Sequence, residues 1–373
     1  MMIPNVVETA DIAVTVPRTD CYKIRIRDGL VETLGEELRR AFGAVSAVVI
    51  SDRNVWTLHG NRVSASMDEA GIPVNAIVLP AGERTKSLHT ANKVYRQLLD
   101  LRARRRTVLI AFGGGMVIDT VGFIAATYLR GVPYINVPTS LLAQVDSAIG
   151  GKVAVNHPAG KNLVGAFHHP SFVYTDPSVL LTSSERDLRS GMAEVVKTAV
   201  IADETLFETI ERAVPAILAR DTETLALIIN RTSLLKVELL SGDPYEADLR
   251  RPLNFGHTVG HAVEKEEGYG RMRHGEAVAV GMAVAARIAV DKGVCPAAIG
   301  ERIVALIRAL GLPTRTRVPV ERIWEAVSVI RMVRDGNLHF VLPGRRLGEV
   351  VMTDDIDESD IARALAGLED GRR

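Results

Sequence analysis

The sequence is poor in cysteine and carries no excess charge of either sign. Its only two cysteines among 373 residues, Cys21 and Cys295, lie far apart and outside any Cys-x-x-Cys pair, so we expect no disulfide framework and a cytoplasmic protein. Lys plus Arg equals Asp plus Glu, at 45 each, which argues against nucleic-acid or membrane-surface binding through bulk charge. The chain does not begin with a basic region and an apolar run, and its most apolar stretch, 277–290, is interrupted by Arg287. We therefore expect neither a signal peptide nor a membrane span.

What the chain does have is apolar sequence, at 47%, enough for a large core in two domains. Short β-rich runs at 22–26, 47–51, 76–79, 107–112, 134–137 and 172–175 alternate with helical patterns at 30–41, 60–70, 87–101 and 117–128. That alternation predicts a parallel sheet with helices on both faces. Later, helical patterns dominate at 188–201, 204–213, 223–240, 258–266, 275–292 and 297–310, before a hairpin from 338–342 and 349–352 and a helix over 358–368. We expect an α/β domain over 1–180, a mainly helical domain over 181–373, and an active site in the cleft between them.

A glycine turn follows the predicted strand 107–112. Gly113, Gly114 and Gly115 stand there, with Asp119 close behind. Glycines at such a turn let a pyrophosphate approach the backbone, where a helix N-terminus favours negative charge. The run is not Gly-x-Gly-x-x-Gly, and a plain tight turn explains it equally well. Asp52 follows another predicted strand, where a carboxylate can bind ribose hydroxyls or simply cap a helix.

The segment 146–167 combines several glycines with Lys152, Lys161 and Asn162. Lysine charge and glycine backbone suit the binding of anionic oxygen atoms. We expect this segment to be an irregular loop that holds a phosphorylated substrate.

A possible metal-binding set comes from the helical half. His257 and His261 are four residues apart, so they share one face of a predicted helix, and Glu194 and His274 lie on other helices. One carboxylate and two imidazoles, from Glu194, His257 and His274, suit Zn²⁺ or a similar divalent ion. Taken singly, each histidine is more simply a hydrogen-bonded residue beside the core. Together with the glycine turn and the lysines, the set indicates an enzyme that uses a dinucleotide and a metal on a phosphorylated polar substrate.

These features occur within longer blocks of familiar sequence. The blocks cover 80–87, 113–119, 121–130, 137–146, 150–167, 193–197, 253–261 and 274–276. In them the chain resembles sugar phosphate cyclases of the 3-dehydroquinate synthase family. The resemblance implies a Rossmann-like NAD domain, a helical metal-binding domain and a homodimer. It also implies a redox-neutral reaction, in which NAD oxidises a ring hydroxyl, phosphate is eliminated, the ketone is reduced, and the opened ring closes by an aldol step.

The resemblance also assigns roles to single residues. The matches to metal ligands, for Zn or Co, are Glu194, His257 and His274. The matches to NAD-contacting positions are Asp52, Glu83, Lys86, Gly114, Gly115, Asp119, Thr139, Ser140, Asp146, Lys152, Lys161 and Thr182. The matches to catalytic and substrate-binding positions are Lys152, Asn162, Lys197, Lys236, Arg250, Asn254 and His261. Arg130 matches a residue that reaches the phosphate site of the partner subunit.

The chain departs from the family pattern at three places. An Asp-Lys-Lys run that precedes Val near the C-terminus is here Ile330-Arg331-Met332, so a lysine that normally meets the substrate is Arg331 or is missing. Ile118 replaces a usual glycine, and Ser140 replaces a usual threonine. These changes leave open an aminodehydroquinate synthase, or a sedoheptulose 7-phosphate cyclase that makes a valiolone.

The valiolone-forming branch usually changes the positions matched by Asn254 and His261, yet both residues are retained, and the retained Lys236 and Arg250 favour a substrate with a carboxylate. The sequence therefore favours 3-dehydroquinate synthesis of the shikimate pathway, in which 3-deoxy-D-arabino-heptulosonate 7-phosphate yields 3-dehydroquinate and phosphate. Two further hypotheses are a metal-dependent polyol dehydrogenase of the same architecture and a non-catalytic sugar-phosphate sensor. The cluster of Lys152 and Asn162 counts against the dehydrogenase, which would not need it for an uncharged polyol, and the presence of every expected metal ligand counts against the sensor.

Overall fold

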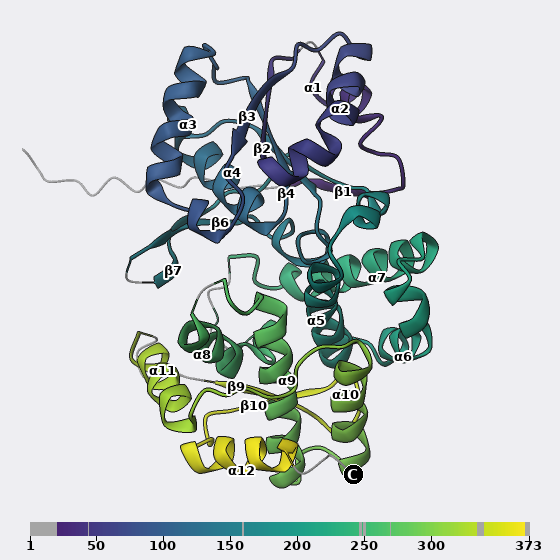
Figure 1. Cartoon of the computed structure of the whole chain (residues 1–373), viewed down its shortest axis with the longest axis vertical. Helices are drawn as coiled ribbons and strands as arrows, with labels where there is room; N and C mark the ends of the chain where they lie inside the picture. The colour runs from purple at the N-terminus through teal and green to yellow at the C-terminus, as the bar shows by residue number, and fades with distance from the viewer. Residues whose placement is uncertain are drawn as a thin grey trace, which may run out of the picture.

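The structure is a computed structural model. It describes residues 21–43, 45–158, 160–245, 248, 251–268, 270–333 and 339–369, without the side chains of 330–333 and 369. Figure 1 shows a sheet-containing half above and a helical half below, with α5 and α7 at the level where the two meet. No helix in these ranges is both long and apolar enough to cross a bilayer.

The upper half is built on a six-stranded parallel sheet. Its strands, in spatial order, are β1 (Lys23–Ile26), β8 (Phe172–Thr175), β5 (Tyr134–Pro138), β4 (Val108–Gly113), β2 (Ala47–Asp52) and β3 (Asn75–Leu79). All six coincide with predicted strands to within a residue at each end. The central strands β2, β4 and β5 are buried along their whole length, which is why each reads as an almost unbroken apolar run.

Helices cover both faces of this sheet, as the alternation predicted. They are α1 (Leu34–Phe42), α2 (Arg53–Glu69), α3 (Leu88–Asp100) and α4 (Gly115–Thr127). One apolar cluster joins Leu34 and Met67 to the sheet, and a second joins Leu98 and Val121 to its other face. The Rossmann-like fold class is therefore confirmed.

The lower half is mainly helical. Its elements are α5 (Glu185–Ala202), α6 (Glu204–Leu218), α7 (Thr222–Ser241), α8 (His257–Glu267), α9 (His274–Asp291), α10 (Ala297–Ala309), α11 (Val320–Val333), α12 (Glu358–Glu369) and the antiparallel pair β9 (Phe340–Pro343) and β10 (Val350–Thr353). Helix α9 is almost wholly buried and packs against α5, α8, α10 and α12. The prediction did not include α11, whose buried side chains among the described residues 320–329 are Ile323, Ala326 and Val327.

The prediction of an irregular loop over 146–167 is wrong. A single π-helical turn, Ala143–Ser147, leads into the antiparallel strands β6 (Lys152–His157) and β7 (Gly160–Phe167). The reason is a period of two that the lysines and glycines conceal, because Val153 and Val155 are buried while their neighbours are not. Val153 packs directly on α4, where a Cβ added to Gly122 would lie 2.2 Å from its Cγ1. The segment is therefore a hairpin, hereafter the β6–β7 hairpin, fixed to the sheet half.

Candidate active site

A cavity of about 560 Å³ lies between the two halves. Its walls come from the β6–β7 hairpin and the turn before it on one side, and from α5, α7 and the start of α8 on the other. The predicted site residues that line it are Asp119, Asp146, Lys152, Asn162, Lys197, Lys236, Asn254, His257 and His261. The structure thus brings together residues that lie far apart in the sequence, in a space large enough for a small sugar phosphate.

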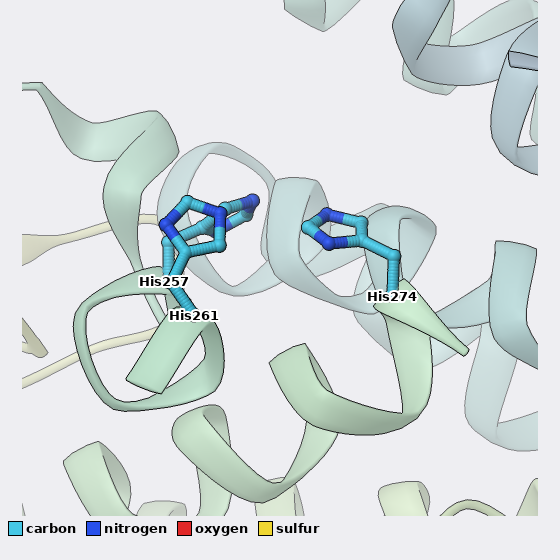
Figure 2. Close-up of side chains that lie close together, drawn as sticks. All are labelled: His257, His261 and His274. Carbon is cyan, nitrogen blue, oxygen red and sulfur yellow. The ribbon is translucent and has the colours of Figure 1, made fainter. Parts of the chain in front are cut away.

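Three imidazoles lie close together (Figure 2), and two of them, those of His257 and His261, line this cavity. His257 and His261 come from α8, and His274 is the first residue of α9. One nitrogen of each ring lies within 4.8 Å of the others. The buried carboxylate of Glu194, on α5, lies against two of them, with Oε1 3.6 Å from Nε2 of His257 and 3.4 Å from Nε2 of His274. Three helices therefore contribute to one cluster of possible metal ligands.

Glycine contacts allow these helices to approach so closely. A Cβ on Gly275 would lie 1.9 Å from the carbonyl oxygen of Ser190, so the start of α9 touches the backbone of α5. A Cβ on Gly281 would likewise lie 1.9 Å from the carbonyl oxygen of Gly256. Gly256 itself has a φ of +76°, a conformation that favours glycine, and it directly precedes His257. The separation of the candidate ligands is therefore set by backbone contacts between helices.

Hydrogen bonds fix the orientation of two of the rings. Nδ1 of His257 donates to the carbonyl oxygen of Phe255 at 3.1 Å, and Nδ1 of His274 donates to Oε2 of Glu264 at 3.2 Å. Because both acceptors are oxygens without a proton to give, each Nδ1 carries the proton, and each Nε2 is left facing Glu194. This is the usual arrangement around a metal-binding histidine. The sequence interpretation missed Glu264, although it stands three residues after His261 and so shares its helix face.

The electrostatics of the cluster suit a cation. Glu194 is only 1% exposed, and neither of its carboxylate oxygens makes a hydrogen bond of good geometry, although Lys197 forms an ion pair with it. Burial raises the pKa of Glu194, but Lys197 and the two histidines outweigh it and hold that pKa well below its usual range. Burial lowers the pKa of His257 to about 4, whereas the nearby carboxylates of Glu194 and Glu264 overcome burial and raise the pKa of His274 to about 10. An ionised, under-coordinated carboxylate facing two oriented imidazoles fits a divalent metal.

A second charged group lies on the same wall of the cavity as the histidines. Lys236, on α7, donates to Oδ1 of Asp146 at 2.7 Å and to its backbone carbonyl at 2.6 Å, and Lys197 lies 4.0 Å from the same carboxylate. Burial raises the pKa of Asp146, but the two lysines outweigh it and lower that pKa. Two ammonium groups are thereby held at the cavity surface, beside the candidate metal site, where anionic oxygens of a substrate can replace or share their partners.

Five of the predicted dinucleotide positions lie at the carboxyl ends of β2, β4 and β5, namely Asp52, Gly114, Gly115, Thr139 and Ser140. The order of the strands reverses between β2 and β4, which is where ligands bind in open α/β sheets. The first turn of α4 has no side-chain cap at Gly114, and a Cβ on Gly114 or Gly115 would meet the hydroxyl of Ser140 or Ser147. Bare backbone N–H groups beside hydroxyls fit a pyrophosphate. Thr139 follows β5 directly, and its N–H bonds to the carbonyl of Gly113.

Asp52 caps α2, since its Oδ1 accepts from the N–H groups of Asn54 and Val55. The helix-cap interpretation of this residue is therefore confirmed, at the same sheet edge. Thr182 lies beside His59, at 2.8 Å between the hydroxyl and Nε2.

The remaining predicted site residues differ in their contacts. Lys86 binds both Asp119 and Asn162, which links α4 to the β6–β7 hairpin. Lys161 forms an ion pair with Glu264 at 2.6 Å, and Glu83 accepts from the amide of Asn156. Arg130 is exposed, has a φ of +67° and does not line the cavity. The predictions for Arg250, and for the side chains of Arg331 and Met332, lie outside the described residues.

Known proteins of related sequence share this architecture. Residues 76–190 match the N-terminal domain and residues 191–331 the C-terminal domain of 3-dehydroquinate synthase. The chain is 46% identical to a 2-epi-valiolone synthase of Actinosynnema mirum, with 98% of this chain and 96% of that protein covered. It is 41% identical to a 3-dehydroquinate synthase of Synechococcus sp., with 96% and 99% covered. A solved 2-epi-5-epi-valiolone synthase from Streptomyces hygroscopicus subsp. jinggangensis, with NAD⁺ and Zn²⁺ bound, is 28% identical with a TM-score of 0.90, covering 96% and 99%.

Proposed function

The chain belongs to the 3-dehydroquinate synthase family of sugar phosphate cyclases, and we propose that it closes a phosphorylated seven-carbon sugar into a carbocycle with NAD and a divalent metal. The observation that carries this proposal is the cavity that both halves line. Beside it, Glu194, His257 and His274 form a metal-type donor set, and His257 lines the cavity together with the lysines expected to hold phosphate and ring oxygens. The sheet edge with its glycine turn opens beside it, through Asp119 and Asp146.

The donor set fits Zn²⁺ or Co²⁺, with Glu194, His257 and His274 as ligands and His261 close by as a substrate-binding imidazole. The strand ends at Asp52 and the Gly113–Gly115 turn would hold NAD. When bound, the metal supplies a Lewis acid for neighbouring hydroxyls, and NAD supplies a reversible hydride acceptor. The histidine Nδ1 bonds keep both Nε2 atoms directed at the metal position, so little reorganisation is needed on binding.

The lysines of this chain would bind the negatively charged groups of the substrate. Lys152 and Asn162, on the β6–β7 hairpin, line the cavity opposite Lys197 and Lys236. Ammonium and amide groups on both sides stabilise the charge that collects on a departing phosphate.

For the substrate, we favour sedoheptulose 7-phosphate, which gives a valiolone. Identity is higher to the valiolone-type relative than to the 3-dehydroquinate synthase, at 46% against 41% over nearly the whole chain. In addition, Arg331 and Met332 replace the lysine pair that is usual in 3-dehydroquinate synthases. Met332 removes one of the two positive charges of that pair, and a substrate without a carboxylate has less need of it. This choice differs from the preference drawn from the sequence alone.

Synthesis of 3-dehydroquinate remains the second candidate, because Lys236, Arg250, Asn254 and His261 are retained. The amino analogue of its substrate is the related alternative. Family membership disfavours a polyol dehydrogenase, and the assembled metal donors disfavour a non-catalytic sensor. We also propose a homodimer, with exposed Arg130 directed to the partner, which light scattering on the purified chain tests.

A substrate panel separates these candidates. The enzyme with NAD⁺ and Co²⁺ is given sedoheptulose 7-phosphate, 3-deoxy-D-arabino-heptulosonate 7-phosphate or its amino analogue, and both released phosphate and product mass are measured. We expect kcat/KM to be highest on sedoheptulose 7-phosphate, with a product of valiolone mass. We also expect Arg250→Ala to change that value little. Turnover confined to the carboxylate-bearing substrate, with a large loss in Arg250→Ala, would instead establish 3-dehydroquinate synthesis.

A further inference from the structure

Glu264 connects the candidate metal site to the β6–β7 hairpin. It lies on the same face of α8 as His257 and His261, at spacings of seven and three residues, and is 4% exposed. Its two oxygens have different partners, because Oε2 accepts from Nδ1 of His274 at 3.2 Å and Oε1 binds the ammonium of Lys161 at 2.6 Å. A buried carboxylate with both oxygens engaged in this way holds a fixed orientation.

We propose that Glu264 is the positioning residue for His274, and that it sets the affinity of the site for a divalent metal. This inference rests on the proposed function in taking Glu194, His257 and His274 as metal ligands. A carboxylate behind a metal-binding histidine fixes the tautomer and the ring plane and makes the coordinating nitrogen a stronger donor. In this chain the bond at Nδ1 leaves Nε2 of His274 facing Oε1 of Glu194, 3.4 Å away.

The two oriented histidines differ in what supports them. His257 is held by a neutral backbone carbonyl, that of Phe255, which is present whatever side chain stands at residue 255. His274 depends on the side chain of Glu264, which comes from a different helix. A substitution of Glu264 therefore releases one ligand of the set and leaves the other held. The expected effect is a weakened metal site, with the helices still packed.

Lys161 gives Glu264 a second role. Lys161 is on β7, so the ion pair ties the β6–β7 hairpin of the sheet half to α8 of the helical half. The lysine also compensates the charge of the carboxylate, which no longer needs a proton or water to be stable in a buried place. Removing the lysine leaves the hydrogen bond to His274 intact. The two contacts of Glu264 can thus be separated by mutation.

The test measures metal binding to the full-length, metal-free protein. The Kd for Co²⁺ is determined by competition with a chromophoric chelator, and the visible absorption spectrum of bound Co²⁺ reports ligand geometry. The variants are Glu264→Gln and Lys161→Met, with Glu266→Gln as the matched control. Glu266 is on the same helix and carries the same charge, but it pairs with Arg322, away from the cluster. Circular dichroism and thermal unfolding of the metal-free forms check that each variant folds.

We expect Glu264→Gln to weaken Co²⁺ binding roughly 10- to 100-fold and to alter the Co²⁺ spectrum, as substitutions behind metal-binding histidines do. Lys161→Met and Glu266→Gln should stay within about threefold of the wild type, well below that range. Unchanged affinity in Glu264→Gln would overturn the inference, and so would an equal loss in Lys161→Met, which would assign the effect to the hairpin contact. Should Glu264→Gln fail to fold, Glu264→Asp serves instead, because it keeps the charge but withdraws the carboxylate, and the same loss is expected.

These results are independent of the substrate. A wild type that binds Co²⁺ but cyclises none of the sugar phosphates, with the deficit still present in Glu264→Gln, would refute the proposed function and leave this inference standing. A wild type that is an active cyclase, with undiminished Co²⁺ affinity in Glu264→Gln, would refute this inference alone.

Discussion

Gly275 is the position where the smallest substitution should do the most damage to the metal site. Its missing side chain lets the first turn of α9 rest on the backbone of α5. A Cβ there would lie 1.9 Å from the carbonyl oxygen of Ser190 and 2.8 Å from its Oγ. Because the closest atom is backbone, it cannot rotate away as a side chain would. In Gly275→Ala, ordinary van der Waals contact at 3.4 Å requires α9 to retreat from α5 by roughly 1.5 Å.

That retreat bears directly on metal affinity. His274 immediately precedes Gly275, and its Nε2 is now 3.4 Å from Oε1 of Glu194. Metal–ligand distances tolerate only about 0.2 Å, so a shift several times larger separates the two ligands. We expect Co²⁺ affinity to fall at least about tenfold, on the scale of losses seen when a ligand is misplaced. We expect the unfolding free energy to fall by about 1–3 kcal/mol, as for overpacked cores.

The assay combines chelator competition for Co²⁺ with thermal unfolding of the metal-free protein. Gly242→Ala is the matched control, because Gly242 has a φ of −78° and a Cβ there would meet nothing within 4 Å. It should keep its metal affinity and unfold within about 1 kcal/mol of the wild type. A Gly275→Ala protein that loses stability but binds Co²⁺ normally would show that the α5–α9 contact does not set the ligand geometry. Normal stability as well would refute the steric argument itself.

His257→Ala removes one imidazole of the set, so turnover should disappear while circular dichroism stays unchanged, and residual metal-dependent turnover would contradict its role. Lys236→Met should lower the unfolding free energy in urea by about 1–3 kcal/mol at neutral pH, because Asp146 loses its charged partner. The lysine helps to hold the pKa of Asp146 below its ordinary value. The stabilisation by this pair is therefore present above the ordinary aspartate pKa and is lost as the pH falls through the lowered pKa of Asp146. A stability deficit of Lys236→Met that persisted in strong acid would contradict this explanation. Gly122→Ala should cost about 1–3 kcal/mol through its clash with Val153, and adding Val153→Ala should recover part of that loss, whereas simple additivity would show that the β6–β7 hairpin does not rest on α4.

Much of the sheet could be predicted because its signal is local. A strand buried on both faces must be apolar throughout, and Val108 to Phe112 is such a run. The pairing of His257 and His261 was also visible, since four residues make just over one helical turn. In both cases the signal lies within one short segment of the sequence.

Contacts between distant segments left no such signal. Glu264 meets Lys161 across 103 residues, and Gly275 meets Ser190 across 85, so neither partner can be found from spacing. In the β6–β7 hairpin, lysines and glycines suggested a loop, whereas the alternation of Val153 and its neighbours decided the structure once α4 offered a surface to pack on. Secondary structure followed from the sequence where packing agreed with composition and was missed where packing overrode it.

The central claim is that NAD⁺ bound to this chain oxidises the substrate, and that the NADH formed reduces it again in the same cavity after phosphate has left. The direct measurement follows released phosphate and NADH absorbance together, with sedoheptulose 7-phosphate, Co²⁺ and NAD⁺. We expect phosphate to be released in step with the cyclised product while no NADH accumulates, and we expect His257→Ala to release none. NADH that accumulates in proportion to substrate loss, without phosphate release, would contradict the account.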